Sequence, residues 1–226
     1  MSITIRSIKG AALTHSEMDI NFTDLRDGVD LKVPKTKGKG LKVDSLGTPS
    51  FGWQDLLGAI GKEEGGPNTP NLNAYIGNIK QYAFDISDEV FVEFHLPHDY
   101  APGTDIYIHT HWSHKVPVVG NVTWGFEVSY AKGHNQAAFS APITTTILQA
   151  SPNIALQHMI AEVQFSASTP SGVQIDTDNI EVDGLLLTRI FLSANTTGVA
   201  PFLHFVDIHY QSTNIPTKQK APDFWV

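Results

Sequence analysis

The 226-residue chain is 41% hydrophobic and 17% charged, a composition typical of folded globular proteins and unlike that of disordered ones. It contains no cysteine, which excludes disulfides, thiol catalysis and cysteine-ligated zinc. No apolar run approaches the roughly 18 residues that cross a bilayer, and the first residues lack the apolar core of a secretory signal. We therefore expect synthesis in the cytoplasm and no membrane partner.

The net charge of −8 is unevenly distributed along the chain. Residues 1–45 contain eight Lys or Arg against six Asp or Glu, whereas the rest of the chain contains seven against seventeen. An acidic body repels phosphates, so nucleic acid is an unfavourable partner. A basic stretch near the start is more typical of a solvated linker than of a DNA contact. It consists of Lys32, Lys35, Lys37, Lys39 and Lys42.

Residues 1–45 are predicted to form a helical anchoring arm. Thr14 and Glu17 have the spacing of a capping box, and Pro34 ends the helical pattern. Apolar residues follow one another at intervals of four, three and four, which gives a narrow stripe on one helix face. Such a stripe packs against a copy of itself, a partner, or its own domain. The residues of this predicted contact are Leu13 (before the cap), Met18, Phe22, Leu25 and Val29.

Residues 46–80 are rich in Gly, Pro and Asn, and are predicted to form a loop-rich spacer. Within it, an apolar group suggests a short helix or turn packed on the main body. This group consists of Phe51, Trp53, Leu56, Leu57 and Ile60.

Residues 81–226 are predicted to form an antiparallel β-sandwich resembling a jelly roll, so that the fold class is all-β with a short N-terminal helical arm. Apolar and polar residues alternate in 89–95 and 105–112, as in strands with one buried face. Further strands are expected at 121–131, 141–149, 158–166, 184–193 and 201–210. Segments with turn-forming residues separate these strands, at 97–103, 132–135, 169–172 and 195–198.

The segment from Pro102 to His114 has the strongest metal-binding character. Alternate residues on a strand share a face, so His109 and His111 are expected to point the same way. Two such imidazoles suit zinc, iron, nickel or copper, either within one chain or shared between three chains on a three-fold axis. We favour the alternative of a polar sheet face or subunit contact with internal hydrogen bonds. No cofactor is therefore expected, with a transition metal at His109 and His111 as the open alternative.

The spacing of Gly103, His109 and His111 resembles the first half of the cupin metal motif, which would imply a metalloenzyme on a jelly roll. The resemblance ends there, because Lys115 and Val116 stand where cupins have a glutamate and the second half has no match. Two later histidines, His204 and His209, could complete a site only if the fold brings them near. No Gly-x-Ser-x-Gly elbow or phosphate-binding glycine loop is present, so we expect a non-enzymatic protein. Three aromatic residues fit either a sugar-stacking patch or a β core: Trp112, Trp124 and Tyr130.

The segment Gly10–Leu25 resembles a short leader found at the start of many tail-fibre and virion proteins of tailed bacteriophages. The matching elements are Leu-Thr, Glu-x-Asp-x-Asn-Phe and a final Leu. They fall at Leu13, Thr14, Glu17, Asp19, Asn21, Phe22 and Leu25. The resemblance implies that this arm attaches an appendage to the phage particle.

The body is similar to a group of phage structural proteins of unassigned role. The similar segments are 94–100, 102–112, 120–125, 207–210 and 220–225. The resemblance implies a virion protein, most simply a trimeric tail fibre or adaptor, with a head fibre or capsid decoration (cement) protein as the alternative. Its expected partners are its own copies and other proteins of the tail, neck or capsid, and a host-surface receptor remains open. Phe224 and Trp225 are expected to pack into an adjacent chain, since two terminal aromatics would otherwise face water.

Overall fold

The computed structural model describes residues 42–43, 49–165 and 180–224, and the chain divides into two compact units, 1–51 and 52–226. In the first unit, β1 (Lys42–Val43) pairs antiparallel with β2 (Pro49–Ser50). The predicted arm helix lies outside the described residues, as do its contact residues and Trp225. Within the described part, no helix has the length and apolar character required to span a membrane.

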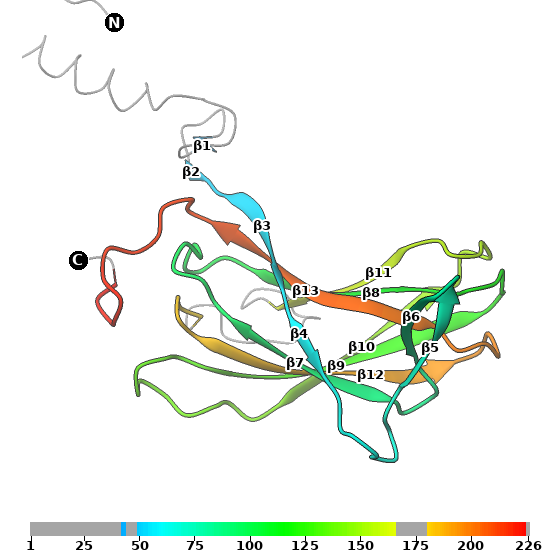
Figure 1. The fold of residues 1–226 in the computed structure, drawn as a ribbon. Helices are drawn as coiled ribbons and strands as arrows, with labels where there is room; N and C mark the ends of the chain where they lie inside the picture. The colour runs from blue at the N-terminus through cyan, green and yellow to red at the C-terminus, as the bar shows by residue number, and fades with distance from the viewer. Residues whose placement is uncertain (1–41, 44–48, 166–179, 225–226) are drawn as a thin grey trace, which may run out of the picture. The chain divides into compact units, whose positions relative to one another are not determined.

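The second unit is a sandwich of two antiparallel sheets (Figure 1). Its strands are β3 (Gly52–Leu57), β4 (Ala59–Gly61), β5 (Asn71–Ile76), β6 (Ile79–Ala83), β7 (Glu89–His95), β8 (Ile106–Ser113), β9 (Asn121–Ala131), β10 (Ile143–Ala150), β11 (Met159–Phe165), β12 (Leu185–Asn195) and β13 (Phe202–Ser212). The β9 sheet has the order β10-β9-β12-β7-β4. The β8 sheet has the order β11-β8-β13-β6-β5, and β3 also pairs with β13.

The topology from β6 to β13 is that of a jelly roll. Successive strands pass from one sheet to the other, except that β10 pairs directly with β9. The all-β sandwich predicted from the sequence is therefore confirmed. All seven strands expected between residues 81 and 226 are present, and the expected ranges 89–95 and 121–131 coincide with β7 and β9.

The core lies between the sheets and is dominated by large aromatic residues. Trp112 and Trp124 are completely buried, with ring centroids 6.3 Å apart, and Phe84 packs edge-on against Trp124 at 5.2 Å. Tyr130 is also buried, and burial raises the pKa of its hydroxyl to about 12. These three predicted aromatics, Trp112, Trp124 and Tyr130, are thus core residues and do not form a sugar-stacking surface.

Part of the predicted spacer belongs to the sandwich. β3 pairs with β13 in the β8 sheet and β4 pairs with β7 in the β9 sheet, so that the chain crosses between the sheets at Gly58. A Cβ at Gly58 would lie 2.1 Å from Val92 and 2.6 Å from Phe94, which leaves room for glycine alone. The prediction of a short helix or turn here was wrong. A short apolar run without clear alternation does not distinguish helix from strand.

The segment after β13 packs against the end of the sandwich in its own chain. Asp99 accepts a hydrogen bond from the Tyr210 hydroxyl at 3.1 Å and so ties the 97–103 turn to β13. Phe224 is only 2% exposed, and its ring lies 5.8 Å from that of His98 and 5.9 Å from that of His134. The expectation that Phe224 packs into an adjacent chain is therefore corrected, because its own fold provides the aromatic contacts that bury it.

Candidate functional site

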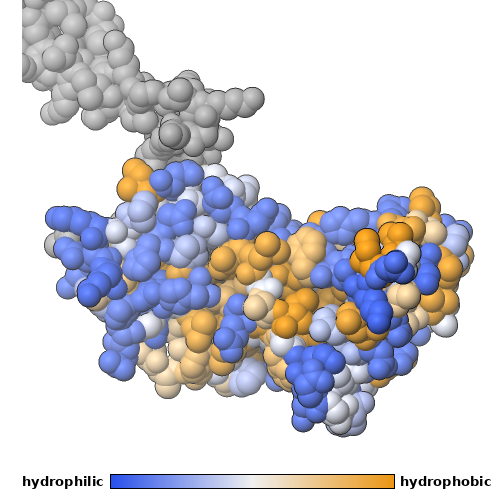
Figure 2. Space-filling view, viewed as in Figure 1, coloured by the Kyte–Doolittle hydropathy of each residue, from blue (hydrophilic) through white to orange (hydrophobic). Residues whose placement is uncertain are grey.

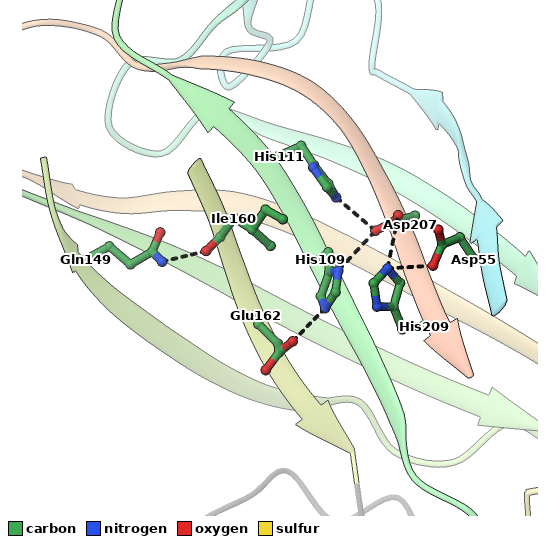
Figure 3. A network of polar contacts seen from close by, with 8 residues as sticks. All are labelled: Asp55, His109, His111, Gln149, Ile160, Glu162, Asp207 and His209. Atoms are coloured by element: carbon green, nitrogen blue, oxygen red, sulfur yellow. Dashed lines mark hydrogen bonds and ion pairs between the residues drawn. The ribbon is translucent and has the colours of Figure 1, made fainter. Parts of the chain in front are cut away.

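Histidines and carboxylates gather on the outer face of the β8 sheet (Figure 3). In β8, Ile108 and Trp112 point into the core, so His109 and His111 lie together on the opposite face, with ring centroids 5.9 Å apart. They expose only 3% and 5% of their surface. We call this surface the histidine face; it comprises His109, His111, His158, His204 and His209, with Asp207 among them.

A bulge in β13 brings the acidic residue onto this face. Leu203 points into the core, and the next residue paired with β8 is Phe205, opposite His111. His204 is therefore an extra residue in the register. Beyond it, Phe205 and Asp207 point outward; a regular strand would have kept them on the same face as Leu203, in the core.

Asp207 lies at the centre of the histidine face. Its Oδ1 lies 3.1 Å from His111 Nε2 and 3.6 Å from His109 Nδ1, and its Oδ2 lies 3.8 Å from His209 Nε2. The residue is 4% exposed. Among the residues that the structure describes, its ion-pair partners are these three histidines and include no Lys or Arg.

Two further carboxylates flank the cluster on the solvent side. Glu162 in β11 accepts a hydrogen bond from His109 Nε2 at 2.7 Å, and Asp55 in β3 lies 2.6 Å from His209 Nε2. Burial lowers the pKa of His109, although the hydrogen bond to Glu162 opposes this effect. Because Glu162 accepts the hydrogen bond from Nε2, the ring nitrogen that faces Asp207 is Nδ1. This buried Nδ1 has no hydrogen-bond partner.

The other histidines of this face are held by stacking and hydrogen bonds. The His111 ring stacks on Phe205, with centroids 3.8 Å apart, and its Nδ1 is hydrogen-bonded to His158 Nε2 at 2.7 Å. His204 Nε2 is hydrogen-bonded to the Ser113 hydroxyl at 2.8 Å. Burial lowers the pKa of His204 to about 4, and the nearby His158 and His111 add to the shift. Burial also lowers the pKa of His158, followed by the influence of His111.

The structure places the two predicted metal ligands in different surroundings. Potential ligand atoms of His109, Asp207 and His209 lie within 4.8 Å of one another. His111 contacts the same carboxylate but belongs to the stacked half of the face. Reasoning from the sequence considered His209 and missed Asp207. The signal for Asp207 was its i, i+2 spacing from His209 on one strand.

The two alternative metal arrangements that the sequence suggested do not fit this geometry. Ligand sites of β-barrels lie in the barrel mouth, whereas this cluster lies on the outside of a sheet whose inner side is filled by Ile108 and Trp112. That placement gives no support to a cupin-like site. An ion shared by three chains through His109 and His111 is equally unsupported, since both rings are buried against neighbours in their own chain.

The outer face of the β9 sheet has a second feature, an open groove of about 430 Å³ lined in part by Phe91, Leu187 and Arg189. The Arg189 guanidinium lies over the Phe191 ring at 4.3 Å and pairs with Glu127 at 2.8 Å. A contact with a second glutamate, Glu89, completes its pairing. The charges of Arg189 and of its two glutamates are thus paired within the chain, which indicates a structural contact.

No protein-family model matches the chain, and no curated protein matches it. Similar solved structures include the xylan-binding module CBM15, which is 8% identical, with 71% of this chain and 97% of that chain covered and a TM-score of 0.36. TmCBM61 in complex with β-1,4-galactotriose is 10% identical, with coverage of 70% and 88% and a TM-score of 0.30. The CBM22-1–GH10 modules of Clostridium thermocellum xylanase 10B are 14% identical, with coverage of 74% and 28% and a TM-score of 0.34. This chain thus spans less than a third of that xylanase structure, and the likeness concerns the β-sandwich alone.

Proposed function

We propose that this chain is a non-enzymatic structural protein of a tailed-bacteriophage particle, fastened by its N-terminal arm and carrying the β-sandwich as its outer domain. The observation that carries the proposal is the resemblance of Gly10–Leu25 to the leader of phage tail-fibre and virion proteins. The resemblance of the body to phage structural proteins agrees with it. The leader favours a tail fibre or adaptor over the alternative of a head fibre or capsid decoration protein.

The places that the body segments take in the fold support a structural role. Trp112 and Trp124 come from two of these segments and pack together in the core. Asp99 and Tyr210 come from two others and are joined by a hydrogen bond at the end of the sandwich. These residues hold the sheets and turns together, which is the work expected of a particle component that must remain folded outside the cell.

Assembly from several copies, most simply three, is part of the proposal. Figure 2 shows hydrophobic surface interspersed with hydrophilic residues over the part of the sandwich crossed by β3 and β4. Large apolar side chains are more than 40% exposed at Trp53 and Leu57 in β3 and at Phe91 in β7. Exposed large apolar side chains such as these are the kind that contacts between subunits cover.

The proposal is tested by the copy number of this protein in purified particles, measured by quantitative mass spectrometry against the major capsid protein. We expect a few to a few tens of copies, as for a tail or neck appendage. Several hundred copies would favour the decoration protein and reject the fibre. Absence from purified particles, with the protein present in the infected cell, would reject both structural roles.

A further inference from the structure

We propose that His109, Asp207 and His209 form a binding site for a divalent transition-metal ion on the outer face of the β8 sheet. The site joins β8 to β13, and its ligands come from segments separated by almost a hundred residues. It goes beyond the proposed virion role, and its existence does not depend on where the protein resides.

The distances between the potential ligand atoms suit one ion. His109 Nδ1 lies 3.6 Å from Asp207 Oδ1, and His209 Nε2 lies 3.8 Å from Asp207 Oδ2 (Figure 3). Ligands about 2.1 Å from a tetrahedral zinc ion are separated by about 3.4 Å, so small movements of the side chains are sufficient. The rings of His109 and His209 are already in edge contact, with centroids 3.9 Å apart.

The unpartnered nitrogen of His109 is the second, independent observation. Nδ1 is buried without a hydrogen bond, on a residue that is 97% buried, although most buried polar atoms in proteins have a partner. It faces the carboxylate of Asp207 at 3.6 Å, beyond hydrogen-bond distance, in a site shielded from water. A cation between these two atoms would give Nδ1 the partner that it lacks.

Glu162 holds His109 in the form that a metal requires. Its carboxylate accepts a hydrogen bond from Nε2 at 2.7 Å and leaves the Nδ1 lone pair available to bind a metal. A carboxylate bound to the other nitrogen of a ligating imidazole is a recurrent feature of metal sites, where it fixes the tautomer and the ring orientation. Glu162 is thus a positioning residue for the proposed ligand.

The local charge also favours a cation. Asp55, Glu162 and Asp207 surround the two imidazoles, and within residues 49–165 and 180–224 their ion-pair partners are all histidines. A buried carboxylate without a cationic partner is unfavourable. A divalent ion would add positive charge beside Asp207, the least exposed of the three.

The donor set indicates which ions bind. Two imidazoles and one carboxylate suit Zn²⁺, Co²⁺, Ni²⁺ or Fe²⁺, whereas Mg²⁺ and Ca²⁺ prefer oxygen ligands alone. Asp55 lies 2.6 Å from the proposed ligand nitrogen of His209, so that nitrogen must give up its contact with Asp55, and any proton on it, when it binds the ion. Asp55 is outside the group of three whose ligand atoms lie together, and water completes the coordination.

The test is zinc binding by the purified full chain after treatment with a chelator, measured by equilibrium dialysis and metal analysis. We expect a single tightly bound Zn²⁺ per chain, and visible ligand-field absorption when Co²⁺ replaces it. His209→Gln should weaken zinc binding at least tenfold; its ring is partly exposed, so the variant should fold, which circular dichroism checks. His158→Gln is the matched control, an imidazole of the same face outside the triad, and should bind as the unmodified chain does.

A second variant separates metal positioning from general stability. Glu162→Gln keeps all three ligands, and should weaken zinc binding by about 10- to 100-fold. Its melting temperature without metal should be close to that of the unmodified chain, while the increase caused by zinc should shrink. The proposal is overturned if the unmodified chain binds no zinc, or if zinc binding is lost in His158→Gln and retained in His209→Gln. The presence or absence of the protein on particles affects neither outcome.

Discussion

His204, a member of the histidine face, is held by a chain of two hydrogen bonds that runs through Ser113 to Tyr75. Its Nε2 lies 2.8 Å from the Ser113 hydroxyl, which in turn lies 2.5 Å from the Tyr75 hydroxyl, and the Tyr75 and His204 rings are in contact. His158 and His111 lie on its other side, and protonating His204 would place a positive charge in a partly buried group of imidazoles. The neutral form is thus the one that the fold stabilises.

This arrangement predicts a pH-dependent contribution to stability. The pKa of His204 is about 4 in the folded chain, below the usual 6.5, so the unfolded chain binds the proton first as the pH falls. Its contribution is therefore fully present above pH 6.5 and is lost towards pH 4. His204→Gln should reduce the fall in unfolding free energy between pH 7 and pH 4 by about 2 kcal/mol, allowing for partial exposure.

Denaturant unfolding at several pH values measures this effect. Phe139→Ala, a change at an exposed residue that does not titrate, is the control and should show the pH profile of the unmodified chain. Equal pH profiles for His204→Gln and the unmodified chain would show that His204 is not the group responsible.

The candidate site was only partly predictable from single residues. Because side chains alternate along a strand, the spacing of His109 and His111 was sufficient to place both on one face. The contact with Asp207 depends on the pairing of β8 with β13, which no local pattern contains. Five positions separate His204 from His209, and regular alternation would put them on opposite faces. The extra residue at the bulge brings them to the same one.

At the scale of elements, the crossing between β3 and β4 joins the two sheets along one side of the sandwich. The Gly58 amide donates a hydrogen bond to the Val206 carbonyl oxygen at 3.0 Å. Val92 and Phe94 occupy the space that a Cβ at this position would need. This close approach allows a single continuous segment to extend one sheet and then the other. The crossing therefore contributes to the relative position of the two sheets.

Gly58→Ala should destabilise the sandwich by about 1–3 kcal/mol, because the added methyl group overlaps Val92 and Phe94 in a packed core. Thermal or denaturant unfolding measures the change. Gly61→Ala, three residues on in β4, is the matched control: its Cβ would make only an ordinary contact with the Phe91 carbonyl, at 3.6 Å. If both variants are equally stable, Val92 and Phe94 can shift to make room for a methyl group at Gly58, and the tight packing of the crossing is not required for stability.

Strands in the middle of a sheet were easier to predict from the sequence than largely exposed strands. β7, β9 and β12 have neighbours on both sides and one face in the core, and Gly, Asn or Pro marks their ends. Polar and apolar residues alternate along β7 and through much of β9, whereas β12 is mostly apolar on both faces. β3 and β5 are largely exposed, and only one or two of their residues approach the core. Their sequences therefore lack the alternation, and only pairing with neighbouring strands defines them as strands.

At the scale of the whole molecule, the chain after β13 closes one end of the sandwich. Thr217 is hydrogen-bonded to His98 through both its amide, at 2.9 Å, and its hydroxyl, at 2.5 Å. Asp183, two residues before β12, contacts His95, His98 and His134. Segments from four parts of the sequence thus meet around Phe224.

Phe224→Ala should lower the unfolding free energy by about 3 kcal/mol, as expected for truncation of a buried phenylalanine. Because its own chain buries the ring, the loss should be independent of protein concentration. Phe139→Ala, at a site that is 47% exposed, is the control and should change stability by less than about 0.5 kcal/mol. A loss that grows on dilution would instead indicate that the segment exchanges between chains.

The bulge at His204 also bears on how such a surface could arise or disappear during evolution. β13 carries an apolar set, Val206, Ile208 and Tyr210, and between its members a polar set that includes Asp207 and His209. Deletion of one residue at the bulge would move each set to the opposite face of the sheet, so that the polar set would point into the core. Insertions and deletions here are therefore far more consequential than substitutions. Homologues that differ by one residue at this point should differ in the chemistry of the whole outer face.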